Sequence, residues 1–446
     1  TGVYARNTEL IIHKSSLISN KRYAIQLKNS QLKLKSTTFK KPEMSFDYKG
    51  ELYVNPSSTY VTDLNENNIS IIKPEKITAN TQEELDKALN YAEINDNIEI
   101  HIGEGNYRIE KIITGREDIY LKGNKEGKTD ITGYLAFGSC YDINLLNLDM
   151  MFDGQAYNGI EAKHSYFMNI ENFRIKDSLQ NGIQLTDSIV NIKNTYCVNS
   201  ASAGLIAVNT DLKISKSFFE NNGVTGISGI NSNINMNEVN SYHNRQQSGM
   251  TVVECDVTVY NSNFYSNGIT GISAENSDLH INNTSINKNA SYGIEGASSD
   301  LRLNNLEITE NKDYGLILYE NNELSGNNIT FTGNGSGVYI KGNSKINLDN
   351  LNIRKSDNYG IKLKDTNDKS NELLINLNDI KISYAEYGLY TDNSSLILKN
   401  AVFDNISDTA IYLTNSSHLK TNQIQFGNNI TSKIYSDATS SHNLSD

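Results

Sequence analysis

The chain has 446 residues, of which 37% are hydrophobic, and it contains no Trp and only 3 Pro, so many thin apolar layers suit it better than one large globular core. Its net charge of -12 at pH 7 argues against nucleic acid as the main partner, because an acidic surface repels phosphates. No apolar run approaches the roughly 20 residues that span a bilayer, so membrane insertion is not expected.

The first forty residues are predicted to form two coils of a solenoid. The segments Gly2-Val3-Tyr4 and Ala24-Ile25-Gln26-Leu27 lie 22 residues apart and share one pattern. Residues 41–78 hold all three prolines and little periodicity, which predicts a linker or an extended arm. Two interpretations of residues 1–40 stay open. They continue another solenoid that precedes them, or they dock on the far end of a neighbouring stack.

A helix is predicted from about residue 81 to residue 93, at the start of a region that runs to residue 446. Thr81-Gln82-Glu83-Glu84 matches a capping box, and apolar residues then recur at helical spacing: Leu85, Ala88, Leu89 and Ala92. An alternating strand follows at residues 97–102. We expect this helix to cap the open apolar end of a stack of strands, which would otherwise be a sticky edge.

A Gly followed by an apolar residue recurs mostly every 22 or 23 residues from residue 159 onward. The positions are Gly159, Gly182, Gly204, Gly226, Gly249, Gly271, Gly293, Gly315, Gly337, Gly360, Gly388 and, with Ala in place of Gly, Ala410. Apolar residues also lie eight and ten positions after the Gly, as in Val190 and Ile192, which is the alternation of a strand. No helical period occurs inside the repeat. The pattern predicts an all-β stack of about a dozen parallel coils, each with at least two short strands.

Asparagines form a further column near the end of each coil: Asn222, Asn244, Asn267, Asn289 and Asn311. Asn tolerates the left-handed conformation of a tight corner, and its amide can hydrogen-bond to the next coil. We interpret this ladder as structural. Cys140, Cys197 and Cys255 have no CxxC spacing, so they predict neither a disulfide framework nor a zinc site and are expected to be buried.

The succession of cap helix, strand, Gly-Glu-Gly-Asn-Tyr turn at residues 103–107 and Gly-apolar coils resembles the pectate-lyase-like superfamily of right-handed parallel β-helices. The similarity covers about residues 79–430. Within the superfamily, the sequence pattern is most similar to that of alginate C-5 epimerase modules and related parallel β-helix repeat proteins. It implies the right-handed fold and a carbohydrate partner. It also implies that the strand beginning at the Gly carries the substrate face.

The epimerase motif Tyr-Gly-Phe-Asp-Pro-His is absent from the coil best placed to match it. That coil reads Asn181-Gly182-Ile183-Gln184-Leu185-Thr186, so Asn181, Gln184 and Thr186 stand where Tyr, Asp and His would act. None of these three side chains can perform the same proton transfers. An epimerase is therefore disfavoured.

Tyrosines and lysines gather at the outward positions of the later Gly strands. The candidate substrate-binding residues are Tyr292, Tyr314, Tyr319, Tyr339, Lys341, Lys362, Lys364, Tyr390 and Tyr412. Tyr rings repeated at coil spacing could stack on sugar rings, and the lysines could pair with uronate carboxylates. The alternative is that a Tyr before a Gly only packs a turn.

Glu275 and Glu295 lie on adjacent coils and are the candidate catalytic residues. Their carboxylates could approach within roughly 5–9 Å, the separation used by paired acids in glycoside hydrolysis. A lyase would instead need a cation and a base, which Lys341 with Tyr339 could supply. The alternative for both acids is an ordinary solvated face. No metal or cofactor is expected, although the elongated coil at residues 365–368 could hold calcium without resembling an EF-hand loop.

The leading hypothesis is an extracellular or cell-surface protein, or a phage tail component, that binds an extended polysaccharide along the sixth to twelfth coils. Lyase-type or hydrolase-type processing of the polymer stays open. The alternative is a non-catalytic adhesin or a structural stalk, whose coils mainly provide length.

Overall fold

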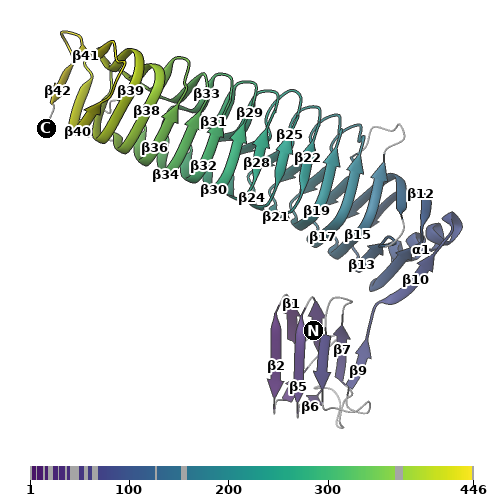
Figure 1. Cartoon of the computed structure of the whole chain (residues 1–446). Helices are drawn as coiled ribbons and strands as arrows, with labels where there is room; N and C mark the ends of the chain where they lie inside the picture. The colour runs from purple at the N-terminus through teal and green to yellow at the C-terminus, as the bar shows by residue number, and fades with distance from the viewer. Residues whose placement is uncertain are drawn as a thin grey trace.

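The computed structural model describes residues 3–6, 8–13, 16–18, 24–28, 30–35, 38–40, 50–54, 59–62, 69–125, 128–151, 158–366 and 375–443. The chain forms a long solenoid of parallel strands, with a smaller stack of parallel strands beside one end (Figure 1). We call the smaller stack the N-terminal solenoid and the longer one the main solenoid.

The N-terminal solenoid pairs its strands in the orders β1-β4-β7-β9, β2-β5-β8 and β3-β6. These are β1 (Val3–Arg6), β2 (Glu9–His13), β3 (Ser16–Ile18), β4 (Ile25–Lys28), β5 (Gln31–Lys35), β6 (Thr38–Lys40), β7 (Gly50–Val54), β8 (Thr59–Thr62) and β9 (Ile69–Ile72). The sequence suggested a linker or arm over residues 41–78, yet β7, β8 and β9 lie there and are paired. Ile25 pairs with Leu52 and Leu52 with Ile71, and these unequal steps hide the period from the sequence.

Helix α1 (Gln82–Ile94) closes one end of the main solenoid, as predicted (Figure 1). The Thr81 hydroxyl accepts a hydrogen bond from the Glu84 backbone N–H, and the Glu84 carboxylate accepts one from the Thr81 N–H, which completes the capping box. The predicted apolar face, from Leu85 to Ala92, is buried in the same core as the first strands. The helix therefore covers the end of the apolar interior.

The first half of the main solenoid contains β10 (Glu75–Ala79), β11 (Ile98–Ile102), β12 (Gly105–Thr114), β13 (Glu117–Lys122), β14 (Thr129–Gly138), β15 (Tyr141–Met151), β16 (Ile160–Lys163), β17 (Tyr166–Lys176), β18 (Ile183–Thr186), β19 (Ile189–Val198), β20 (Leu205–Val208), β21 (Asp211–Ser215), β22 (Phe218–Glu220), β23 (Ile227–Ile230), β24 (Asn233–Asn237), β25 (Asn240–Tyr242), β26 (Met250–Val253), β27 (Asp256–Tyr260) and β28 (Asn263–Tyr265). The second half contains β29 (Thr270–Glu275), β30 (Asp278–Asn287), β31 (Tyr292–Ala297), β32 (Asp300–Thr309), β33 (Tyr314–Tyr319), β34 (Glu323–Thr332), β35 (Ser336–Lys341), β36 (Lys345–Arg354), β37 (Tyr359–Lys364), β38 (Ile375–Asp392), β39 (Ser395–Thr414), β40 (His418–Phe426), β41 (Ser432–Ser436) and β42 (Ser441–Asn443).

Each coil carries strand segments on three faces, where the sequence predicted at least two. The Gly face follows the repeated glycines and includes β16, β18, β20, β23, β26, β29, β31, β33, β35, β37 and β41. The second face includes β11, β13, β21, β24 and β27. It also includes the first parts of the long strands, which are β15, β17, β19, β30, β32, β34, β36, β38, β39 and β40. The third face includes β22, β25, β28 and later parts of the same long strands. β14 and β41 extend the Gly face beyond the predicted dozen coils.

The register of the Gly face agrees with the register predicted from the glycines. Ile183 pairs with Leu205 and Ile294 with Leu316, and all four side chains are fully buried. The glycines are required by the close approach of successive coils. A Cβ at Gly204 would lie 2.7 Å from the backbone oxygen of Gly226 in the next coil.

The asparagine ladder is buried and hydrogen-bonded along the stack, as predicted. The Asn244 side-chain amide donates to Asn267 Oδ1 at 2.9 Å, and Asn267 donates to Asn289 Oδ1 at 3.0 Å. The predicted left-handed conformation, however, belongs to the preceding residue of each corner, such as His243 with a φ of 55°. Because the residue before each ladder asparagine adopts the left-handed conformation, the asparagine itself does not, and its side-chain amide points into the stack.

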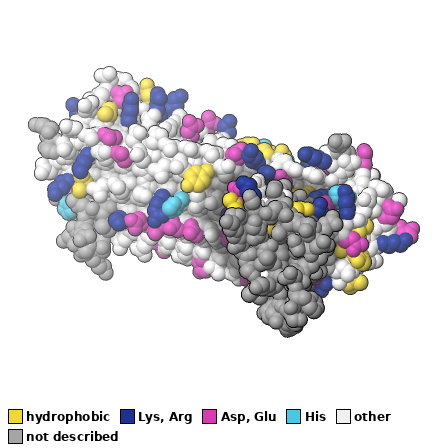
Figure 2. Space-filling view, turned by 90° about the horizontal axis from the view of Figure 1, so that it is seen from below, with side chains coloured by type: hydrophobic (Ala, Val, Ile, Leu, Met, Phe, Trp, Pro, Cys, Tyr) yellow, Lys and Arg dark blue, Asp and Glu magenta, His cyan; other side chains and the backbone are white. Residues whose placement is uncertain are grey.

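Cys140, Cys197 and Cys255 are buried and unpaired, as predicted. No helix in the described ranges is long and apolar enough to cross a bilayer. Seen from below, the surface is mostly polar and uncharged, with charges of both signs scattered over it (Figure 2). The N-terminal solenoid contacts the second face through Arg6, whose guanidinium lies 3.9 Å from Asp142 and 3.3 Å from the centre of the Phe167 ring.

Candidate functional site

The candidate residues lie at outward positions of the Gly face, between β29 and β41. One straight column runs through the second position after each glycine, or after Ala410 and Lys433 in the last two coils: Ser273, Glu295, Ile317, Tyr339, Lys362, Tyr390, Tyr412 and Tyr435. A neighbouring column holds Glu275, Ala297, Tyr319, Lys341, Lys364 and Asp392. The alternation predicted from the sequence therefore places these side chains on one face.

The tyrosines of this face lie in a row that consists of two groups of contacting rings, with Lys362 between Tyr339 of the first group and Tyr359 of the second. We call it the tyrosine row: Tyr292, Tyr314, Tyr319, Tyr339, Tyr359, Tyr387, Tyr390, Tyr412 and Tyr435. Tyr319 joins the first group through its hydrogen bond with Tyr292. The Tyr390 and Tyr412 rings stack at 5.0 Å between centroids with planes 6° apart, and Tyr412 stacks on Tyr435 at 4.4 Å. Successive coils are roughly 4.8 Å apart, which is close to the separation of stacked rings.

This stacking changes how the row can meet a ligand. Rings that face each other along the stack present their edges and hydroxyl groups outward, while their flat faces are already covered. The predicted stacking of sugars on ring faces is therefore available only where a ring lacks a neighbour on one side. Elsewhere the row offers phenol hydroxyls, once per coil in its regular part.

Part of the row also has a packing role. Ile317 points outward between Glu295 and Tyr339, and yet it is only 1% exposed. The Tyr319 side chain, in the adjacent column, hydrogen-bonds Tyr292, and its burial raises its pKa. The tyrosines around Ile317 thus form a small second layer of packing outside the main core.

Lys362 is held in the middle of the row. Its Nζ lies 4.5 Å from the ring centroid of Tyr359, 5.4 Å from that of Tyr339 and 5.5 Å from that of Tyr390. Cation–π attraction favours the ammonium there. Partial burial nevertheless lowers the pKa of Lys362, and the nearby charge of Lys364 adds to this effect.

The other two lysines differ in their surroundings. Lys364 pairs with Asp392 at 3.7 Å between Nζ and Oδ2, so its charge is partly neutralised. Lys341 is exposed at the outward position paired with Tyr319, and it makes no ion pair with any described residue. Lys362 is therefore the cation with the most ring contacts in the site, and Lys341 is an exposed charge in the neighbouring column.

The two candidate acids do not share a column. Ser273 pairs with Glu295, whereas Glu275 pairs with Ala297, so the acids are offset by two positions on adjacent coils. Glu275 is exposed, while burial raises the pKa of Glu295 against the opposing effect of a 3.4 Å hydrogen bond from the Ser273 hydroxyl. Glu295 is the member of the pair with the properties of a proton donor.

Sequence reasoning missed one end of the row. Tyr435 occupies the outward position in β41, but Lys433 stands in that coil where the glycine would be, so the glycine register does not reach it. The Tyr387 hydroxyl donates to Asp408 at 2.8 Å, which raises the pKa of Tyr387 to about 12.

The calcium candidate at residues 365–368 falls partly outside the described residues, and no group of His, Cys, Asp or Glu suited to a metal occurs among those described.

A family model for the right-handed β-helix region matches residues 158–302 and 294–445. No curated protein matches the sequence.

Among solved structures, the catalytic unit of a GH87 alpha-1,3-glucanase from Streptomyces thermodiastaticus is 13% identical, with a TM-score of 0.41 over 60% of this chain and 63% of that one. The A-module of an Azotobacter vinelandii mannuronan C-5 epimerase is 15% identical, with a TM-score of 0.33 over 83% and 97%. A tailspike protein of an Escherichia coli O157:H7 bacteriophage is 10% identical, with a TM-score of 0.37 over 72% and 46%. The chain thus spans less than two thirds of the glucanase unit.

Proposed function

The chain belongs to the right-handed β-helix family, and from this premise we propose that its Gly face binds an extended acidic polysaccharide along the tyrosine row. The observation that carries the proposal is Lys362, a cation held among the Tyr339, Tyr359 and Tyr390 rings in the middle of a straight outward column. We further propose a location where such polymers occur, outside the cell, on a cell surface or on a virion tail.

The repeat of the row supports a polymer rather than a small ligand. The coils are roughly 4.8 Å apart, and a sugar unit of an extended chain has a similar length. The ring centroids of Tyr390, Tyr412 and Tyr435 follow one another at 5.0 and 4.4 Å, so one phenol hydroxyl recurs in each of these coils. A polymer lying along the solenoid axis can therefore meet an equivalent hydroxyl at each successive unit.

The charges support an acidic polymer. Partial burial of Lys362 weakens the screening of its charge by water, so a carboxylate that reaches it gains more than it would at an exposed lysine. Lys341 lies two positions beyond Tyr339 on the same strand and can pair with a carboxylate on a neighbouring sugar. These residues suit uronate units better than neutral sugars.

The binding experiment compares two lysines in the full chain. Lys362→Met is expected to weaken binding to polygalacturonate or alginate by tenfold or more in affinity electrophoresis. The matched control is Lys345→Met, because Lys345 lies on the second face and pairs with Glu323. Equal affinities of the two variants would contradict the proposal.

Cleavage is tested separately from binding. If the site hydrolyses the polymer, Glu295 is the acid that acts, and Glu295→Gln removes the release of reducing ends while affinity is retained. If a lyase reaction takes place, unsaturated products accumulate. A chain that binds and yields neither product is an adhesin or a stalk, a candidate supported by the packing of the tyrosines over Ile317.

A further inference from the structure

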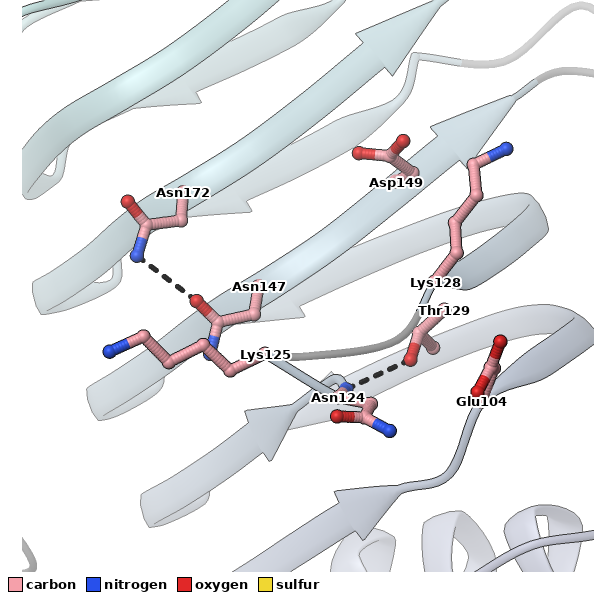
Figure 3. Close-up of a pocket in the computed structure, with 8 residues that line it drawn as sticks. All are labelled: Glu104, Asn124, Lys125, Lys128, Thr129, Asn147, Asp149 and Asn172. Atoms are coloured by element: carbon pink, nitrogen blue, oxygen red, sulfur yellow. Dashed lines mark hydrogen bonds between the residues drawn. The ribbon is translucent and has the colours of Figure 1, made fainter.

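A groove runs along the corner between the second and third faces, near the capped end of the main solenoid. It consists of three adjoining hollows of about 680, 400 and 330 Å³. Asn147 lines the first and the last of these, and Asp149 and Asn172 line the first and the second, so the hollows are continuous. We call it the corner groove; its largest part is drawn in Figure 3.

The groove exists because one coil turns this corner differently from those that follow. In the following coils a single residue with positive φ makes the turn, such as Asn147 at 56°, Asn172 at 51° and Asn194 at 48°. Strand β13, by contrast, ends at Lys122 and β14 begins only at Thr129. The base of this longer turn is pressed onto the next coil, since a Cβ at Gly123 would lie 2.0 Å from the Asn147 carbonyl oxygen.

The floor of the groove is a ladder of exposed amides (Figure 3). Asn172 Nδ2 donates to Asn147 Oδ1 at 3.0 Å, and Asn194 Nδ2 donates to Asn172 Oδ1 at 2.7 Å. Each amide has two N–H groups and an oxygen with two lone pairs, so the ladder uses only part of its capacity. The remaining donors and acceptors repeat at coil spacing along the groove.

Charged groups and a ring complete the lining. Asp149, Arg174 and Tyr196 follow one another in a single column of the third face. Arg174 has no ion-pair partner among the described residues, and Tyr196 is 37% exposed. The groove therefore offers a carboxylate acceptor, a guanidinium donor and an aromatic ring on three successive coils.

The charges of the groove are balanced, which selects between ligand classes. Among the described residues that line it, Lys128 pairs with Asp130 at 2.9 Å and Lys122 with Glu99 at 2.5 Å. The other described cations of the lining, Lys125 and Arg174, are matched in number by Glu104 and Asp149. A balanced site does not attract a polyanion, whereas a hydroxyl group can both donate and accept hydrogen bonds. The lining is thus complementary to uncharged sugars.

We propose that the corner groove is a second carbohydrate site, which binds a neutral oligosaccharide along the solenoid axis independently of the Gly face. Carboxylate and amide oxygens accept hydrogen bonds from sugar hydroxyls, Arg174 donates to them, and Tyr196 contacts an apolar sugar face. The ligand differs in charge from the acidic polymer proposed for the tyrosine row.

The test uses calorimetry on the full chain with neutral hexasaccharides of β-1,4-glucan, β-1,3-glucan and β-1,4-mannan, and with a galacturonate hexamer as the acidic probe. At least one neutral hexasaccharide is expected to bind, and Asp149→Ala or Arg174→Ala to weaken that binding tenfold or more. Asp149→Asn keeps the size of the side chain and provides a second variant if the alanine variant folds poorly.

Two controls separate this site from others. Asn328→Ala removes an amide of the same corner ladder far from the groove, where Asn328 donates to Asn305 at 2.8 Å, and should leave affinity unchanged. Lys362→Met should also leave neutral-sugar binding unchanged, so that failure of the Gly-face proposal and failure of this one can be told apart. Absence of binding to every neutral probe, or a galacturonate preference that Arg174→Ala abolishes, would overturn the proposal.

Discussion

The tyrosine row and the corner groove are both built from side chains that repeat along the coils, but they meet a ligand in different ways. In the row, each ring covers the face of its neighbour, as Tyr390 and Tyr412 do at 5.0 Å. In the groove, the longer turn after Lys122 breaks the repeat and leaves a hollow. In the row, side chains of successive coils therefore cover one another, whereas the longer turn after Lys122 leaves the largest hollow of the groove beside it.

The same contrast occurs among the asparagines. Asn267 lies in the buried ladder, where both its oxygen and its amide are used by neighbouring coils. Asn172 lies in the exposed ladder of the groove and keeps part of its hydrogen-bonding capacity for solvent or a ligand. We therefore expect the buried asparagine ladder to contribute mainly to stability, and the exposed ladder in the groove to contribute mainly to binding.

The largest effect is expected from the buried ladder. Asn267→Ala leaves the backbone N–H and the side-chain N–H of Asn244 without their shared acceptor, Asn267 Oδ1, and should lower the free energy of unfolding by about 3 kcal/mol. Asn328→Ala, in the exposed ladder, should change it by less than about 0.5 kcal/mol. Equal losses in urea denaturation would show that burial does not distinguish the two ladders.

A smaller difference is expected between tyrosines of the two regions. Tyr390 contacts the rings of Tyr359, Tyr387 and Tyr412, so Tyr390→Ala should destabilise the fold by about 2 kcal/mol. Among the described residues Tyr196 stacks on Phe218 alone, at 4.6 Å, and Tyr196→Ala should cost about 1 kcal/mol. Guanidinium denaturation curves of the two variants measure both values. A larger loss for Tyr196 would reverse the order of the two regions.

The register of the coils could be predicted because the glycines report it directly. A side chain at Gly204 would collide with the next coil, so the residue is fixed by geometry and recurs in the sequence. The third face was not predicted as a separate strand, although its inward column is apolar at Phe219 and Phe264 and polar at Ser241, because β22, β25 and β28 have only 3 residues each, too few to show an alternation.

The outward columns of the candidate site could also be predicted, but not what their side chains do to each other. Whether the Tyr412 ring offers its face or its edge depends on Tyr390 and Tyr435 in neighbouring coils. The longer turn that borders the corner groove, after Lys122, precedes the first repeated glycine, Gly159, although Arg174 and Tyr196 follow that glycine, so the sequence period did not draw attention to the groove. Its concavity arises from one long turn, and that turn looks ordinary in the sequence.

The smallest predicted effect is a pH dependence that only the tyrosine row should show. The pKa of Lys362 is below its ordinary value of 10.5, because partial burial disfavours the ammonium. As pH rises through this lowered pKa, Lys362 loses its charge before exposed lysines do, and affinity for polygalacturonate should fall by less than about tenfold. The neighbouring phenols of Tyr339 and Tyr359 do not titrate first, since burial raises the pKa of each.

This step in affinity can be assigned to Lys362 by comparing variants between pH 7 and pH 10. Lys362→Met should bind weakly at every pH and show no step, whereas Lys345→Met should keep the step of the unmodified chain. Neutral hexasaccharides in the corner groove should bind with nearly constant affinity over the same range, because these ligands carry no charge and Lys362 does not line that groove. An identical pH profile for both ligands would mean that the row and the groove share one site, and the contrast between them would fail.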